Sequence, residues 1–223
     1  MRPVQLCLGV DPRQPIAATV LAHSLTTRSS LPLSITRLQL SQLPITRRGL
    51  TEFTYSRFLT PWMHNFDGIS IFLDADMLCL GDIASLLAYP LAYPDVAVFI
   101  VQHAKKFEWP SLMVFNNARC SMLTPEYVQD PAHKLFDFSW ADTIGNLPHE
   151  WNHLVGYDAP NPDAKLVHFT QGIPCWAETK NCEFSAEWNE EIKRALSTVS
   201  FKALMGNSVH VPYVYANQGG SER

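Results

Sequence analysis

The sequence predicts an α/β fold in which helices flank a mostly parallel central sheet. Apolar runs of strand length alternate with helical patterns along the chain, and this alternation is typical of βαβ units. No internal repeat, low-complexity tract or linker divides the sequence. We therefore expect residues 1–223 to form a single domain with a substantial core.

The expected elements begin with a strand, the apolar run VQLCLGV. Strand, helix, strand, helix and strand then follow one another at residues 4–10, 16–27, 33–38, 52–64 and 68–73. The segment 52–64 has a clear helical period, because its apolar residues recur on one face. Arg57 lies opposite that face, so its side chain is free to reach something other than the core.

The second half of the chain continues this pattern. Apolar runs predict three more strands, at 96–101, 111–116 and 164–169. A C-terminal helix is expected near 186–204, where apolar residues recur with helical spacing and glutamates crowd the first turns. The tail, 205–223, shows no clear pattern and is left unassigned.

Composition narrows the class of protein. The formal charge of −4 and the lack of a basic stripe argue against nucleic acid as the main partner. The apolar runs are too short to span a bilayer, and the N-terminus lacks the pattern of a signal peptide. The five cysteines are scattered without a C-x-x-C pair, which favours a reduced, cytoplasmic protein.

The strongest chemical feature is a carboxylate pair in ISIFLDADMLCLGDI (69–83). The apolar run is typical of a strand buried on both faces, and it ends in Asp74-Ala75-Asp76. Alternate residues of an extended backbone project to the same side, so both carboxylates converge where open α/β sheets bind ligands. Because two carboxylates repel, the pair predicts magnesium or manganese. The alternative is a solvated acidic turn.

A second feature is the histidine in AKLVHFTQGIPCW (164–176). His168 ends an apolar strand and is followed by a turn. It is either a core residue or, if it lies beside Asp74 and Asp76, a third metal ligand. An imidazole ligand would favour manganese over magnesium.

Residues 149–153, HEWNH, match the H-E-x-x-H pattern of zinc metalloproteases. In that class His149 and His153 would bind zinc from one face of a helix, with Glu150 acting on the bound water. Only about two helical turns are available before Gly156. A zinc peptidase is therefore an alternative function.

The chain also contains, in order, five motifs that resemble those of a known family: TYSRFLTPW, IFLDADMLCLGDI, WPSLMVFNN, LPHEWNHLVG and LVHFTQGIPCW. They resemble the glycogenin-like glycosyltransferases, family 8, and especially their short bacterial relatives. The resemblance runs from about residue 4 to 176. It implies a GT-A fold, a single nucleotide-binding α/β domain. It further implies retaining, manganese-dependent transfer of a hexose from a UDP-sugar to a hydroxyl acceptor such as a glycan.

The resemblance also implies roles for individual residues. Asp74, Asp76 and His168 match the metal ligands of the family. Asp11, directly after the first strand, matches a position near the uracil. Arg57 matches an arginine that lies beside the nucleotide.

Further matches concern the sugar. Ser111 falls where the family lines the sugar pocket, and Asn116 follows at the end of that strand. Asp142 lies where the family has Asp-Gln, although residue 143 is Thr here. Asp142 and Glu150 are the carboxylates that we expect to orient the sugar or to act as a nucleophile.

The segment that would contact the diphosphate departs from the family pattern. Gly172 stands one position later than the family's glycine, and Pro174 replaces its lysine. Lys105 or Lys106 could supply the missing charge. The departures also favour an alternative, a domain that binds a nucleotide sugar with little or no turnover.

Overall fold

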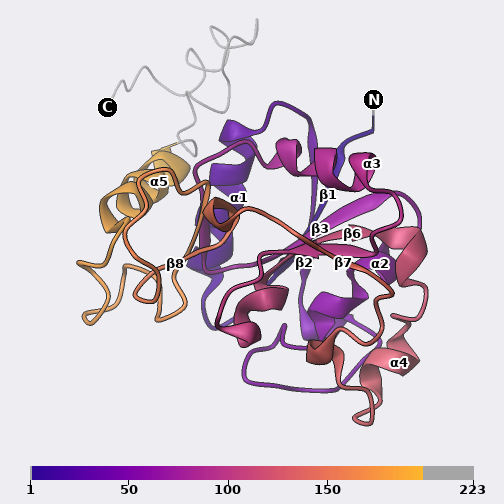
Figure 1. Cartoon of the computed structure of the whole chain (residues 1–223). Coiled ribbons are helices and arrows are strands. Elements are labelled where there is room, and N and C mark those ends of the chain that lie inside the picture. Colours follow the sequence, from indigo (N-terminus) through magenta and orange to yellow (C-terminus); the bar gives the residue numbers. More distant parts are fainter. Residues whose placement is uncertain (1, 198–223) are drawn as a thin grey trace, which may run out of the picture.

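The centre of the structure is a six-stranded sheet with the strand order β2-β1-β3-β6-β5-β7 (Figure 1). The structure is a computed structural model and describes residues 2–197. The strands of this sheet are β1 (Val4–Gly9), β2 (Leu33–Leu38), β3 (Ile69–Asp74), β5 (Val98–Ile100), β6 (Leu112–Asn116) and β7 (Ile144–Asn146). Most of their residues are apolar and buried, as in sheets covered on both faces.

Strand β6 runs against the other strands of this sheet. β1 pairs in parallel with β2 and β3, and β5 pairs in parallel with β7. β6 is antiparallel to both of its neighbours, β3 and β5. The prediction of an α/β fold with a mostly parallel central sheet is therefore confirmed. Because β6 is reversed, its first residues lie at the edge where β3 ends.

Helices cover both faces of the sheet (Figure 1). They are α1 (Pro15–Arg28), α2 (Thr60–Met63), α3 (Ala88–Ala92), α4 (Pro125–Gln129) and α5 (Ser185–Ser197). Side chains alternate along a strand, so Ile71 and Leu73 of β3 pack into a core that includes α1 and α5, whereas Phe72 packs into a second core with α2 and α4. No helix within residues 2–197 has the length and apolar character that crossing a membrane requires.

A second, three-stranded sheet lies beside the carboxyl end of β3. Its strands, in spatial order, are β4 (Met77–Cys79), β9 (Leu166–His168) and β8 (His153–Leu154). β9 pairs antiparallel with β4, so that Met77 is opposite His168. The strand predicted at 164–169 thus exists, and its pairing brings residues distant in sequence next to the end of β3.

One predicted helix differs from the observed structure, and a second is observed over its first part. The segment 52–64 contains the 3₁₀ helix Ser56–Leu59 followed by α2. Pro61 has no N–H to donate to the preceding turn, so an α-helix can begin there but cannot continue through it. The helix expected at 186–204 is observed as α5, and its last part and the tail 205–223 lie outside the described residues. Other 3₁₀ helices lie at Leu40–Gln42, Ile83–Leu87, Lys106–Ser111, Asn117–Cys120, Leu135–Asp137 and His149–Trp151.

A buried ion cluster between α1 and α5 gives the first prediction. The carboxylate of Glu191 lies 2.7 Å from Arg28 Nη2 and 2.5 Å from His23 Nδ1. Burial opposes ionisation, but these two partners hold the pKa of Glu191 below its ordinary 4.5. Glu191→Gln is therefore expected to lower the free energy of unfolding by about 2–3 kcal/mol at neutral pH.

The effect of Glu191→Gln should depend on pH. Because the folded-state pKa is lowered, the stabilisation is complete above the ordinary pKa of 4.5 and is lost as the pH falls through the lowered value. Urea unfolding at about pH 7 and about pH 3 measures the difference. Glu187→Gln, at an exposed position on the same helix, is the matched control. A loss of equal size at both pH values would contradict the prediction.

Candidate metal and nucleotide site

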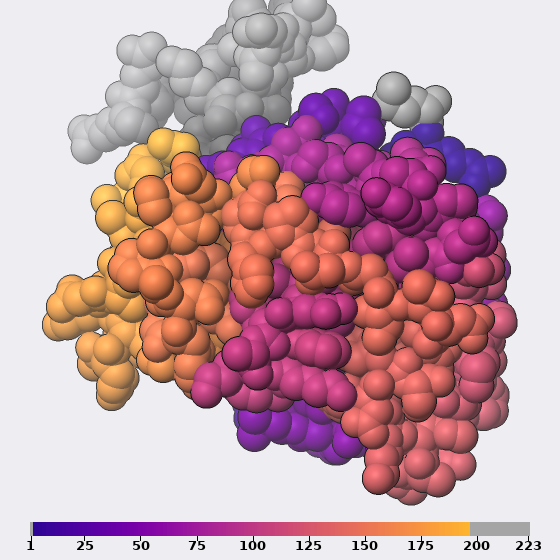
Figure 2. All heavy atoms as spheres, viewed as in Figure 1, coloured from indigo at the N-terminus to yellow at the C-terminus, as the bar shows by residue number. Residues whose placement is uncertain are grey.

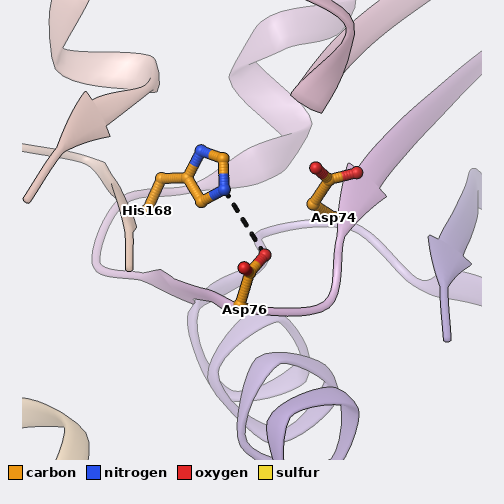
Figure 3. A group of neighbouring side chains, drawn as sticks. All are labelled: Asp74, Asp76 and His168. Carbon is orange, nitrogen blue, oxygen red and sulfur yellow. Dashed lines mark ion pairs between the residues drawn. The ribbon is translucent and has the colours of Figure 1, made fainter. Parts of the chain in front are cut away.

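Three side chains that are far apart in the sequence meet at the carboxyl end of β3. Asp74 is the last residue of β3, Asp76 follows it in the turn to β4, and His168 ends β9. One potential ligand atom from each lies within 4.8 Å of the other two. The three groups point toward one another, and His168 Nε2 lies 3.4 Å from Asp76 Oδ1 (Figure 3). The β4–β9 pairing holds this arrangement, because Phe169 N donates to the Asp76 carbonyl.

The electrostatics of this group favour a cation. Burial raises the pKa of Asp74 to about 7, although the neighbouring Arg57 opposes the rise. Burial alone lowers the pKa of His168, but Asp76 and the other carboxylates nearby raise it above its ordinary value. Asp74 Oδ1 and Asp76 Oδ1 are buried and accept no hydrogen bond. A divalent cation would satisfy both oxygens and keep both carboxylates ionised, and two carboxylates with one imidazole suit manganese or magnesium.

Arg57 is buried against Asp74. Its Nη2 lies 3.2 Å from Asp74 Oδ1, and Nη1 donates to the Pro110 carbonyl at 3.0 Å. Nε donates to the Phe53 carbonyl at 3.3 Å. The side chain therefore reaches the end of β3, and it fixes the first carboxylate of the pair.

A small pocket of about 60 Å³ lies next to the carboxylate pair. Its lining residues come from the end of β1, the start of α1, the loop before Ser56 and the turn after β3: Asp11, Gln14, Ala17, Thr51, Phe53, Ala75 and Asp76. Asp11 is buried, and hydrogen bonds from Arg13 hold its pKa below the ordinary range. The structure thus brings Asp11 to the same edge of the sheet as the three candidate ligands.

Polar residues also lie behind His168. Asn152 Oδ1 is 3.2 Å from His168 Nδ1, and Asn152 Nδ2 donates to Ser111 Oγ at 2.9 Å. Glu108 places Oε2 3.7 Å from His168 Nδ1, and burial raises the pKa of this carboxyl. Sequence reasoning had assigned no role to Glu108. The feature that indicates Glu108 is its position just before β6, because β6 starts at the edge where β3 ends.

Four predicted site residues make no contact with the three candidate ligands in the described structure. Asn116 pairs with Ile69, at the beginning of β3, because β6 runs antiparallel. Asp142 is exposed and precedes β7, whose first residue is level with the beginning of β3. Glu150 lies 3.4 Å from Lys165 Nζ in a partly exposed ion pair. Gly172, with φ of +119°, lies in the loop after β9.

The HEWNH segment does not form the helix that a zinc peptidase requires. His149, Glu150 and Trp151 form a single turn of 3₁₀ helix, and His153 is already in β8. His153 Nε2 forms a hydrogen bond with Glu183 Oε2 at 2.9 Å. The exposed His149 instead packs its ring against the ring of His103. Within residues 2–197, the three candidate ligands at the end of β3 are the one group whose geometry fits a metal. The zinc-peptidase hypothesis is therefore not supported.

Solved structures with the same architecture define the fold. The bifunctional glycosyltransferase WbbM aligns with a TM-score of 0.63 and 14% identity, over 91% of this chain and 50% of that one. GlyE of Streptococcus pneumoniae TIGR4 gives 0.62 and 16%, over 98% and 64%. Galactosyltransferase LgtC, solved with donor and acceptor sugar analogs, gives 0.56 and 9%, over 91% and 99%. The chain thus has the GT-A fold, and it spans about half of the WbbM chain and under two thirds of the GlyE chain.

Sequence comparison assigns the chain to a family. No family model matches the sequence. The chain is 32% identical to Protein CDI of Arabidopsis thaliana over 229 aligned positions, which cover 86% of this chain and 87% of that protein. The protein belongs to the same family as Protein CDI.

Proposed function

We propose that this protein is a metal-dependent glycosyltransferase that transfers a hexose from a UDP-sugar to a hydroxyl acceptor, such as a glycan, with retention of configuration. The observation that carries the proposal is the convergence of Asp74, Asp76 and His168 beside the pocket at Asp11. The fold supports it, because open α/β sheets bind ligands at this edge. The choice of UDP, of a hexose and of retention rests on the family 8 motifs.

The residues have distinct tasks in this proposal. Asp74, Asp76 and His168 would hold manganese or magnesium, which supplies Lewis-acid stabilisation of charge on the leaving diphosphate. Arg57 keeps Asp74 in position and adds positive charge at the nucleotide side of the site. The pocket at Asp11 receives the nucleoside, so that the donor is oriented before transfer.

The family 8 glycosyltransferases have a lysine at the diphosphate, where this chain has Pro174. Two other lysines of this chain are candidates for supplying that charge. Lys105 and Lys106 lie in the segment between β5 and β6, which spans the edge of the sheet above the site. Lys105 Nζ lies 5.4 Å from the centre of the Tyr157 ring, and Lys106 Nζ lies the same distance from the Trp109 ring. In Figure 2 magenta atoms from the middle of the chain adjoin orange atoms from later residues.

A second candidate function is binding of the nucleotide sugar with little or no turnover. Two observations favour it: Pro174 replaces the family's lysine, and Asp142 lies toward the opposite edge of the sheet. A hydrolysis assay with UDP-glucose or UDP-galactose and manganese separates the two. Release of UDP supports the transferase, whereas binding of the donor without release supports the second function.

A thermal-shift experiment tests the proposed site directly. UDP with manganese is expected to raise Tm by about 5–10 °C when the ligand is near 100 times its Kd, because binding stabilises the folded state by mass action. UDP without metal should give a much smaller shift. ADP and GDP serve as comparisons. Equal shifts with and without manganese would contradict a metal-bridged diphosphate.

Gly9→Ala tests the pocket for the nucleoside. A Cβ on Gly9, the last residue of β1, would lie 2.7 Å from Phe53 Cγ, and the Phe53 ring lines the pocket. The ring must move, so we expect a loss of about 1–3 kcal/mol in unfolding free energy and a smaller UDP-dependent Tm shift. Adding Phe53→Leu should recover part of the stability. A loss that Phe53→Leu leaves unchanged would contradict the steric cause.

A further inference from the structure

A chain of hydrogen bonds behind His168 has a fixed direction. It begins at the backbone carbonyl of Glu108, which can only accept hydrogen bonds. Ser111 Oγ lies 2.5 Å from this oxygen and donates its single hydrogen to it. Ser111 Oγ then has no hydrogen left and can only accept from Asn152 Nδ2, at 2.9 Å.

The same carbonyl also fixes the orientation of the Asn152 amide. Asn152 Nδ2 lies 3.4 Å from the Glu108 carbonyl as well as 2.9 Å from Ser111 Oγ. In the flipped orientation the amide oxygen would instead face the carbonyl oxygen, and two acceptors repel. The amide oxygen is therefore the atom that faces His168 Nδ1, at 3.2 Å. An amide oxygen accepts, so Nδ1 must carry the proton.

We infer that Asn152 is a positioning residue that holds the proton of His168 on Nδ1 and thereby directs the Nε2 lone pair at the metal. The inference rests on the metal site of the proposed function. It gives a role to Asn152, which directly precedes the second histidine of HEWNH. The structure does not support the zinc interpretation of that motif. Histidine ligands of metals generally have such a partner on the second ring nitrogen.

One carboxylate lies beside each nitrogen of the His168 ring. The Glu108 carboxylate, 3.7 Å from His168 Nδ1, favours a proton on that nitrogen. Nε2 faces Asp76 Oδ1, 3.4 Å away, on the side of the candidate ligands (Figure 3). Without metal this carboxylate favours a proton on Nε2, and a cation bound there would displace that proton. In the other tautomer the Nε2 hydrogen would occupy the place of the cation. Asn152 and His168 are both buried, so no bulk water replaces the amide oxygen.

Nitrogen NMR of the histidine rings tests the tautomer without any substrate. The protonated and unprotonated ring nitrogens have widely separated ¹⁵N shifts, and the His168 signals are identified by their loss in His168→Gln. In the protein saturated with diamagnetic Mg²⁺, we expect the proton on Nδ1 and none on Nε2. Relative to the metal-free protein, Mg²⁺ should shift Nε2 more than Nδ1. A proton on Nε2 in the Mg²⁺-saturated protein would overturn the inference.

Metal affinity tests the role of the amide. Asn152→Leu removes the acceptor, and we expect it to weaken Mn²⁺ binding about 10–100-fold, as measured from the EPR signal of free Mn²⁺. Asn152→Asp keeps an acceptor toward Nδ1, and Ser111 can turn its hydroxyl to donate to the second carboxylate oxygen, so it should restore part of the affinity. His149→Gln, in the same motif but exposed, is the matched control and should change nothing. Unchanged affinity in Asn152→Leu would overturn the inference, as would equal loss in Asn152→Asp.

Failure of this inference can be told apart from failure of the proposed function. Both measurements use metal alone and contain no nucleotide. Mn²⁺ binding with a proton on Nδ1, but without any response to UDP, would refute the transferase and leave the role of Asn152 in place. A metal-dependent response to UDP with the proton on Nε2 would support the transferase and refute the role of Asn152.

Discussion

Asp76→Asn is expected to abolish the manganese-dependent part of the stabilisation by UDP. The substitution keeps the shape of the side chain but removes one of the two negative charges next to the cation. A wild-type shift of about 5–10 °C should therefore fall to the small value that UDP gives without metal. Thermal-shift titrations with UDP, with and without Mn²⁺, measure this difference.

The ligand-free stability of Asp76→Asn shows whether the loss is specific. Asp76 raises the pKa of the buried Asp74, so removing its charge relieves repulsion within the cluster even though it weakens the ion pair with His168. We therefore expect the ligand-free Tm to change by only about 1–3 °C. Asp163→Asn, at an exposed position, is the control. A full manganese-dependent shift in Asp76→Asn would mean that this carboxylate does not bind the metal.

Arg57→Met is expected to lower the free energy of unfolding by about 2–4 kcal/mol. The substitution leaves the buried carboxylate of Asp74 without its guanidinium partner and removes donors from the carbonyls of Phe53 and Pro110. UDP binding should also weaken, with or without metal, because the positive charge beside the site is lost. Urea unfolding and nucleotide titration measure the two effects separately.

A double substitution tests the cause of the stability loss. Asn at position 74 carries no charge, so Arg57→Met should be less damaging in an Asp74→Asn background than alone. Arg37→Met, on the exposed side of β2, is the matched control and should change stability by no more than about 0.5 kcal/mol. Additive losses in the double variant would show that Arg57 acts mainly through packing and the two carbonyls.

The sequence predicted that Asp74, Asp76 and His168 converge, because their positions follow from local pattern. A buried strand that ends in Asp74-Ala75-Asp76 places both carboxylates at one edge whatever surrounds it. His168 also follows an apolar run, and the β4–β9 pairing brings it to that edge. Arg57 was singled out because it lies opposite the apolar face of its segment. The central strands were predicted for the same reason, since their apolar runs are nearly continuous.

Local pattern does not show the direction of a strand, and the placement of Asn116 at the site depended on that direction. Asn116 was placed at the site as the end of a strand, but β6 is reversed, so that end lies at the opposite edge. The same reversal brings Glu108, which precedes β6, toward His168. Asn152 precedes β8, and its side chain contacts Glu108, Ser111 and His168, which lie in other segments of the chain. Such contacts depend on tertiary packing, which periodicity does not encode.

The reversal of β6 also determines where substrate preference can change. The segment of residues 101–111 leaves β5 and enters β6 at the same edge of the sheet, above Asp74. Residues 104–107 of this segment are exposed, whereas Glu108 and Pro110 contact His168 and Arg57. Insertions and deletions confined to 104–107 therefore change the surface near the site without shifting the register of any strand. In the proposed transferase, acceptor preference can thus change through residues 104–107 while Asp74, Asp76 and His168 stay fixed.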